Sequence, residues 1–391
     1  MNGILIILIF AILLYFIYQK LRLKIYDKIS YKLGLLQNDY NIKKYGVLLN
    51  RMINQNVEIV MYEDYDSLMS ALNDNLIDFG ITYENYFIDA VLGLNSYENK
   101  FYNNIEFCTA LYFNYFQFLS NIFVKDSELS SKFTKLTEIK DFKKIYKRNY
   151  ILGTEDFQSI SFINMFILLV SFGYNPINFK KYDENVDYDE NIIFYLVDTE
   201  ENLKNKMLEN KIDGLLLFRT FNDNVINYIN REKDVIFLDI DFKDTYFDDL
   251  FSIYFFKNNN VLIGVDEFDD IKEKIGFETR MSRVLLLSNK YVKENIVYEF
   301  MKTVYGHNNY FTNVLTNSKN TLATQHNYFE PIQLAYVDKN LPIHDGAKKY
   351  LKEIGFIIEK EYIVEALKLK NNERLKCYWK YKKIGLNEFI L

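Results

Sequence analysis

The sequence predicts an α/β fold in two lobes, with helices covering both faces of mainly parallel sheets. Two observations support this prediction. Short apolar runs alternate with helix-like segments along the chain, and such alternation is typical of βαβ units. The junction LNDNLID (72–78) also returns as MLENKID (207–213), with Asn and Asp at matching places. This internal repeat favours two lobes of similar construction, and chance similarity of two helix-to-strand junctions is the alternative.

The first half of the body begins the alternation. VEIVMY (57–62) is a predicted strand, and Asp66 or Ser67 is the predicted N-cap of a helix with Leu at four-residue spacing. IDFGIT (77–82) is the next predicted strand. YFIDAVLG (86–93) is a predicted helix that ends at its glycine.

The second half continues in the same way. Its apolar runs predict strands at 150–153, 192–197, 212–218 and 235–240. Its periodic segments predict helices at 159–172, around Leu203 and Met207, and at 222–231.

Composition places the chain among folded globular proteins. Its 391 residues are 49% hydrophobic and 26% charged, and this length suggests two domains. Three His and two Cys exclude a zinc site built from these residues and a disulfide framework. The net charge of −6 argues against bulk nucleic-acid binding. We therefore expect no metal, no cofactor and no specific nucleic-acid partner.

The first segment predicts a membrane anchor. Residues 3–18 read GILIILIFAILLYFIY, an uncharged run that reaches the length of a bilayer span when Met1 and Asn2 are added, so the anchor is 1–18. No Lys or Arg precedes the run and no small-residue cleavage pattern follows it, which argues against a cleaved signal peptide. The juxtamembrane segment 19–34 is basic. The positive-inside rule then places the body on the cytoplasmic or virion-interior side.

The C-terminal part of the body resembles a known family. LPIHDGAKKYLKEIGF (341–356) is similar to the closing signature of the TAXI-type solute-binding proteins of TRAP transporters, which have Leu-His-Pro-Gly-Ala followed by Tyr and Glu-x-Gly. No single motif is strong, but the order of the matches covers about 315 residues. The further segments that resemble the family are 45–54, 66–93, 136–159, 210–229 and 294–305.

The resemblance implies a two-lobed type II periplasmic-binding-protein-like fold, preceded here by one transmembrane helix. Lobe 1 would comprise 35–124 and 241–355, lobe 2 would comprise 125–240, and 356–391 would be an extension. We expect each lobe to have its own sheet, with a two-stranded hinge joining the lobes and a small carboxylate ligand between them. The residues that match ligand-facing stretches of the family are Tyr45, Thr82, Tyr83, Thr154, Ser159 and Arg219. The residues that match its structural turn are His344, Gly346 and Ala347.

The ligand loops depart from the family pattern. Where the family has Gly-rich and hydroxyl-bearing turns, this chain has acidic residues at or beside the matching positions. They are Glu63, Asp64, Asp66, Glu84, Glu155 and Asp156. Carboxylates around an anion site repel an anionic ligand. The sequence therefore predicts a retained scaffold with an eroded or retuned site.

Two further segments bear on function. The stretch 368–383 interleaves basic and aromatic residues, which suits anionic lipid or an acidic protein surface, with packing on the body as the alternative. His344 precedes Asp345, but an adjacent pair does not aim the carboxylate at the imidazole, and no nucleophile motif is present. We therefore expect no enzymatic activity.

Two functions remain open. The first is a membrane-anchored, non-enzymatic structural or interaction protein, for which residue usage suggests a particle of a large DNA virus. The alternative is an active TRAP-type receptor for a small carboxylate such as glutamate or an organic acid. The charge of the site between the lobes separates the two.

Overall fold

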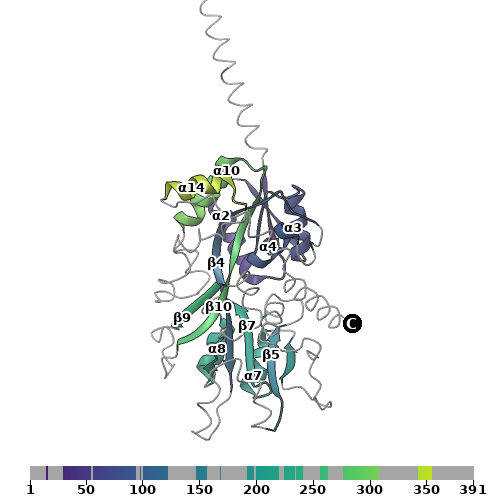
Figure 1. Cartoon of the computed structure of the whole chain (residues 1–391), viewed down its shortest axis with the longest axis vertical. Helices are drawn as coiled ribbons and strands as arrows, with labels where there is room; N and C mark the ends of the chain where they lie inside the picture. The colour runs from purple at the N-terminus through teal and green to yellow at the C-terminus, as the bar shows by residue number, and fades with distance from the viewer. Residues whose placement is uncertain are drawn as a thin grey trace, which may run out of the picture.

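The computed structural model describes residues 15, 30–53, 56–93, 97, 100–121, 147–155, 168, 192–197, 200–219, 224–233, 235–240, 256–262, 276–307 and 342–354. They form a mixed α/β fold, which confirms the predicted class (Figure 1). The predicted anchor 3–18, apart from Tyr15, lies outside this part of the chain, as do Ser159, Asp156 and the segment 368–383. Within the described part, no helix is both long and apolar enough to cross a membrane.

The strands join in one hydrogen-bonded sheet with the order β2-β1-β3-β10-β4-β7-β5-β6, while β8 pairs with β4 and β9 with β10. Their bounds are β1 Tyr31–Leu36, β2 Val57–Tyr62, β3 Phe79–Tyr83, β4 Ile105–Ser120, β5 Tyr150–Glu155, β6 Ile192–Val197, β7 Gly214–Arg219, β8 Ile236–Phe237, β9 Phe256–Leu262 and β10 Gly276–Asn289. The described helices are α2 Tyr40–Met52, α3 Tyr65–Asn73, α4 Glu84–Leu92, α7 Glu200–Leu208, α8 Asn224–Glu232, α10 Glu294–Gly306 and α14 Asp345–Glu353.

Two long antiparallel strands connect two parallel groups. β1, β2 and β3 are parallel to one another, and so are β5, β6 and β7. β4 pairs with β10 over residues 105–115 and with β7 over residues 115–120. The prediction of separate sheets is therefore wrong, because β4 passes from the first group to the second. The sheet is also less parallel than predicted, since β10 runs antiparallel to both β3 and β4.

Most local predictions are confirmed with shifted ends. β2 and β6 have the predicted bounds, and Gly93 ends α4 in the left-handed conformation with φ 64°. The N-cap of α3 is Asp64, two residues before Asp66 and three before Ser67, because its carboxylate accepts the Ser67 N–H at 2.7 Å. The predicted strand 235–240 is reduced to β8. Residues 31–34, predicted as juxtamembrane, lie in β1.

The repeated sequence junctions 72–78 and 207–213 correspond to a structural repeat. Asn75 and Asn210 both follow a helix and both have φ 59°, a left-handed conformation that Asn tolerates better than most residues. Asp78 accepts the Lys32 N–H at 2.8 Å, and Asp213 accepts the Ile151 N–H at 2.9 Å. Each Asp therefore holds the start of the strand that follows it against the first strand of its own group.

The repeat extends to packing and to the long strands. A Cβ on Gly34 would overlap Ile77, and one on Gly153 would overlap Ile212, so both groups need glycine at the same place. Asn289 ends β10 and Asn121 follows β4. The Asn289 backbone N–H donates to the Asp78 carbonyl, and its side-chain amide donates to a carbonyl of α3. The Asn121 backbone N–H donates to the Asp213 carbonyl in the same way, and its side-chain amide donates to a carbonyl of α7. β10 therefore closes the first group as β4 closes the second.

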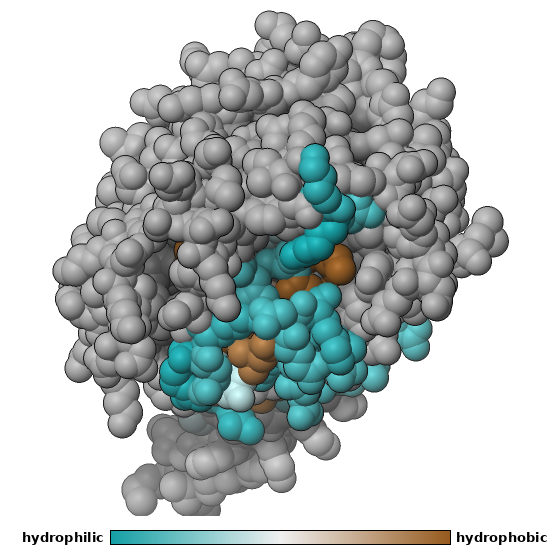
Figure 2. Space-filling model, turned by 90° about the horizontal axis from the view of Figure 1, so that it is seen from below, coloured by the Kyte–Doolittle hydropathy of each residue, from teal (hydrophilic) through white to brown (hydrophobic). Residues whose placement is uncertain are grey.

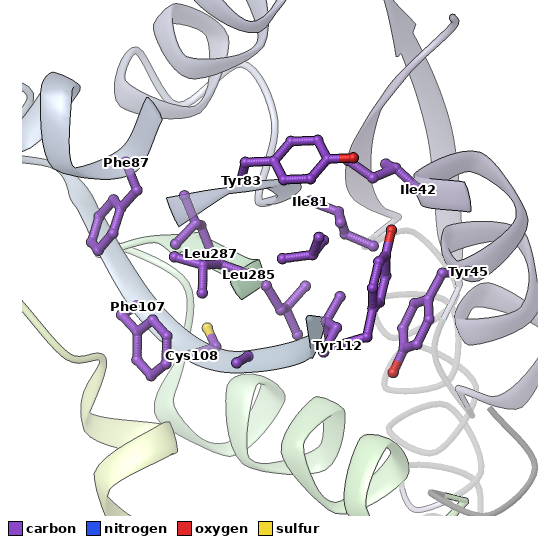
Figure 3. Packing of buried hydrophobic residues seen from close by; sticks show 14 of the residues in the cluster. Ile42, Tyr45, Ile81, Tyr83, Phe87, Phe107, Cys108, Tyr112, Leu285 and Leu287 are labelled. Atoms are coloured by element: carbon purple, nitrogen blue, oxygen red, sulfur yellow. The ribbon is translucent and has the colours of Figure 1, made fainter. Parts of the chain in front are cut away.

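The main core lies around the first group. α2 covers one face, where Tyr45 packs against Tyr112 with ring centroids 5.7 Å apart (Figure 3). α10 lies on the same face, since Phe300 stacks on Phe79 at 3.8 Å. α3 lies on the other face, where Leu68 and its neighbours pack on Gly80.

The predicted family turn is a structural joint. His344 is the N-cap of α14: its Nδ1 accepts the Gly346 N–H at 3.1 Å and its Nε2 donates to the Val292 carbonyl at 2.9 Å. A Cβ on Gly346 would overlap the Glu294 carbonyl, and Ala347 is fully buried. Because both imidazole nitrogens are occupied, His344 forms no catalytic dyad with Asp345.

Acidification should destabilise this joint. Burial lowers the pKa of His344 below its usual 6.5, so below that pH the unfolded chain binds the proton first and folding stability falls. His344→Asn keeps a capping side chain but does not titrate. We expect the stability advantage of the wild type over this variant to shrink between pH 7.5 and 5.5, by up to about 1.4 kcal/mol per pH unit.

Urea denaturation of the full-length protein in detergent measures this difference. His307→Asn is the matched control, because His307 is exposed at the end of α10. Parallel stability curves for the wild type and His344→Asn would contradict the assignment.

Candidate functional site

The carboxyl ends of both parallel groups meet at one place, which we call the strand crossing: residues 112–115 of β4 and 281–284 of β10. Tyr83, the last residue of β3, lies opposite Val284, which in turn lies opposite Tyr112. Arg219, the last residue of β7, lies opposite Tyr115. β3 and β7 run in opposite directions and end within a few residues of each other along β4. Ligands of open α/β folds bind at such carboxyl ends.

Asp39 is the central polar group at the strand crossing. Its half-buried side chain caps α2, where Oδ1 accepts the Ile42 N–H at 3.0 Å. Oδ2 accepts a hydrogen bond from the Tyr83 hydroxyl at 2.9 Å and a longer one from the Tyr65 hydroxyl at 3.4 Å. A helix N-terminus and two phenols thus converge on one carboxylate, which is the donor set that suits an anion.

The second strand group, β5 to β7, places the positive charge of Arg219 near the same carboxylate. Burial raises the pKa of Asp39, while the Ile42 and Tyr83 hydrogen bonds and the positive charge of Arg219 oppose this rise. Burial also raises the pKa of Tyr83 well above 10, so its hydroxyl stays protonated and donates at neutral pH. The pKa of Asp39 is raised on balance, so burial outweighs the donors from one strand group and the cation from the other, which offset part of its cost.

Further buried polar groups surround this cluster. Asn114 donates its amide N–H to the Tyr83 hydroxyl at 3.0 Å. Ser282 lies opposite Asn114, and Tyr112 lies two residues away on the same face of β4. The Tyr112 hydroxyl, the Ser282 hydroxyl and the Asn114 Oδ1 have no hydrogen-bond partner among the described residues. In Figure 3 the Tyr112 hydroxyl points toward the side of the sheet where Tyr83 and Ile42 lie.

The predicted ligand residues fall into separate places. Tyr83 and Arg219 lie together around Asp39. Tyr45 is buried on α2 behind Tyr112, and Thr82 is buried on the face of β3 opposite to Tyr83. Thr154 is buried in β5, and its hydroxyl, like that of Thr82, has no partner among the described residues.

The predicted acidic residues do not form a repelling ring. Glu63, Asp64 and Asp66 are exposed, and Asp64 is used as a helix cap. Glu84 is fully buried in a bidentate ion pair with Arg283 of β10, whose Nε donates at 2.9 Å. The expectation that Glu84 repels a ligand is therefore wrong, because Arg283 neutralises its charge. The side chain of Glu155 and all of Asp156 lie outside the described residues.

Sequence reasoning missed Asp39, Asn114 and Arg283. Asp39 stands directly before a helix, and Asp in that position is a recognised N-cap signal. The other two residues carry no local signal, since Arg283 pairs with Glu84 across 199 positions of chain. The described residues contain no group of three or more His, Cys, Asp or Glu that could hold a metal ion.

Comparison with known proteins gives weak matches. No protein-family model and no curated protein matches the chain. The periplasmic binding protein BugD has a TM-score of 0.42 at 10% identity, with 91% of this chain and 97% of that chain covered. A Xanthomonas citri protein bound to ATP has a TM-score of 0.41 at 10% identity, covering 93% and 99%. A ligand-binding component of an ABC-type import system from Staphylococcus aureus has 0.39 at 11%, covering 86% and 95%.

Likeness at this level carries no argument by itself, so the fold assignment rests on the strand order and pairing of the chain itself. That order gives a mixed α/β scaffold with two similar strand groups, which β4 and β10 join. These comparisons do not show membership of the TAXI family.

Breaking the buried ion pair should destabilise the fold strongly. Arg283→Met leaves the Glu84 carboxylate buried without its partner, and such a loss costs about 3–5 kcal/mol. The double variant Glu84→Met with Arg283→Met should recover most of that loss, because no uncompensated charge remains. Urea denaturation of the full-length protein in detergent measures both.

The matched control is Lys348→Met, which breaks the exposed pair of Lys348 with Asp345 and should cost less than about 1 kcal/mol. An equal loss in the single and double Arg283 variants would show that packing, and not charge pairing, is what Arg283 provides.

Proposed function

We propose that this protein is a non-enzymatic, membrane-anchored scaffold of the solute-binding-protein-like kind, with a structural or interaction role. The observation that supports it is Asp39, whose carboxylate accepts bonds from the α2 N-terminus and Tyr83 and lies near the charge of Arg219. The chain thus places its own carboxylate where a carboxylate ligand would find its donors.

An external carboxylate would have to compete with Asp39. Two carboxylates about 4 Å apart repel by about 4 kcal/mol at an intermediate dielectric. Micromolar affinity corresponds to only about 8 kcal/mol, so this repulsion removes a large part of it. The competing group is also covalently attached and pays no entropy of association.

A receptor for a small carboxylate is the second candidate. It is favoured by Arg219, which is partly exposed at the end of β7, and by the hydroxyls of Thr82 and Thr154 that lack partners within the described residues. In that case the ligand would displace Asp39 from its donors. The anchor at 3–18, the cytoplasmic or virion-interior body, and lipid or acidic-protein contacts of 368–383 belong to the first proposal.

Ligand titration separates the two candidates. We expect glutamate, glutamine and 2-oxoglutarate to give no binding heat with the full-length protein in detergent, because Asp39 holds the site. We expect acetate to raise the melting temperature of Asp39→Gly, because acetate supplies the missing carboxylate. Glycine is tolerated at an N-cap, so this variant should still fold.

Asp64→Gly is the matched control, because Asp64 caps α3 at an exposed position and accepts its hydrogen bonds from Ser67. A micromolar dissociation constant in the wild type would place the receptor function first. Equal acetate responses in the two glycine variants would contradict the built anion site.

The anchor is tested by alkaline carbonate extraction of membranes. We expect the full-length protein to stay in the pellet, because residues 3–18 are apolar around the whole helix that they would form. A variant without residues 3–18 is the control and should appear in the supernatant. Release of the full-length protein, or a mature N-terminus after residue 18, would overturn the anchor.

A further inference from the structure

At the end of the first strand group that lies opposite to the strand crossing, the start of β1, the start of β3 and the end of β10 lie side by side. Asp78 accepts the Lys32 N–H at 2.8 Å, and its carbonyl accepts the Asn289 N–H at 2.9 Å. The residues just outside this edge, Leu76 and Tyr291, therefore lie on neighbouring strand ends. We call this region the β1 edge.

The β1 edge carries unusual apolar exposure. Tyr291 is 65% exposed and Leu76 is 63% exposed, the two highest values for large hydrophobic side chains among the described residues. The ammonium group of Lys290 lies 5.0 Å from the centre of the Tyr291 ring. An exposed Tyr and Leu beside a Lys is the residue combination found where proteins meet the bilayer interface.

The charges around this edge nearly cancel. Lys32 and Lys293 are exposed, Lys290 is half-buried, and Glu294 is paired with Lys349 of α14 at 2.8 Å. The carboxylates that oppose them are exposed Asp74 and half-buried Asp78, together with Glu58 opposite Lys32 and Glu106 near Lys290. Because this edge is nearly neutral, the apolar side chains supply the attachment, and Lys290 supplies a local contact to headgroups.

The chain itself directs this edge toward a membrane. The described body begins at Ser30, beside the start of β1, and only the residues 19–29 separate it from the apolar run 3–18. Fully extended, this connection reaches about 40 Å at most. In Figure 1, α10 and α14 lie at one end of the body, whereas α7 and α8 lie at the other, which is the end that Figure 2 shows with mostly hydrophilic described residues.

We propose that the β1 edge docks on the lipid surface, with Leu76 and Tyr291 inserted at the interface and Lys290 reaching the headgroups. This inference rests on the proposed anchor. It fixes the orientation of the body: the strand crossing and Asp39 face away from the bilayer, where a partner protein or solute can reach them.

Fluorescence quenching by brominated lipids tests the docking. The full-length protein with Trp379→Phe loses its single Trp, and Tyr291→Trp then places a probe on the β1 edge. In vesicles of phosphatidylcholine and phosphatidylserine, we expect this probe to lose most of its fluorescence. Tyr228→Trp is the matched control, since Tyr228 is 38% exposed on α8 at the far end and should keep its intensity.

A second pair of variants tests the contact itself. Leu76→Glu should reduce quenching of the probe at position 291, because a carboxylate at the interface opposes insertion and is repelled by phosphatidylserine. Met61→Glu should not reduce it, because Met61 is 37% exposed near the carboxyl end of β2, away from the β1 edge. Melting temperatures confirm that each variant folds, and Leu76→Trp provides a second probe position if Tyr291→Trp does not.

Carbonate extraction of the same samples distinguishes the two proposals. Protein that pellets while the probe at 291 is quenched no more than the probe at 228 overturns the docking and leaves the anchor intact. Protein that is released into the supernatant overturns the anchor and the docking with it. Pelleted protein with quenching confined to the β1 edge supports both.

Discussion

The sharing of β4 and β10 between two strand groups is the constraint on which the rest of the structure depends. β4 has 16 residues and β10 has 14, well above the usual strand length, because each serves both groups. Their crossing brings the carboxyl ends of β3 and β7 together, which sets Tyr83 and Arg219 around Asp39. The buried Glu84–Arg283 pair lies beside the same crossing and joins α4 to β10. The polar site therefore exists only where both groups are assembled.

The local half of this architecture could be predicted from the sequence, and the long-range half could not. Period, caps and turn residues act within a few positions, so β2, β6 and the left-handed Asn75 and Asn210 follow from their neighbours. Sharing of β4 is a matter of pairing between distant segments, which an apolar run does not reveal. The resemblance to a two-lobed family supplied the two groups, but not the continuity of hydrogen bonds through them.

The candidate site shows the same limit in terms of charge. A sequence displays where carboxylates occur but not which of them are neutralised, capped or buried. Glu84 looked like a repelling group and is matched by Arg283, while Asp64 is occupied as a helix cap. Asp39, for which the sequence analysis made no prediction, is the carboxylate that accepts hydrogen bonds from one strand group and lies near the positive charge of the other. The charge state of a site is thus a property of its partners, and these come from distant parts of the chain.

The shared strands also have a consequence for the order in which the protein can be made. Asn289, at the end of β10, donates to the carbonyl of Asp78 at the start of β3. Ribosomal synthesis runs from the N-terminus, so β3 leaves the ribosome some 200 residues before the strand that covers its edge. Throughout that interval the nascent chain presents an unpaired edge of β3. A chaperone that shields β3 would thus be needed during translation rather than after it.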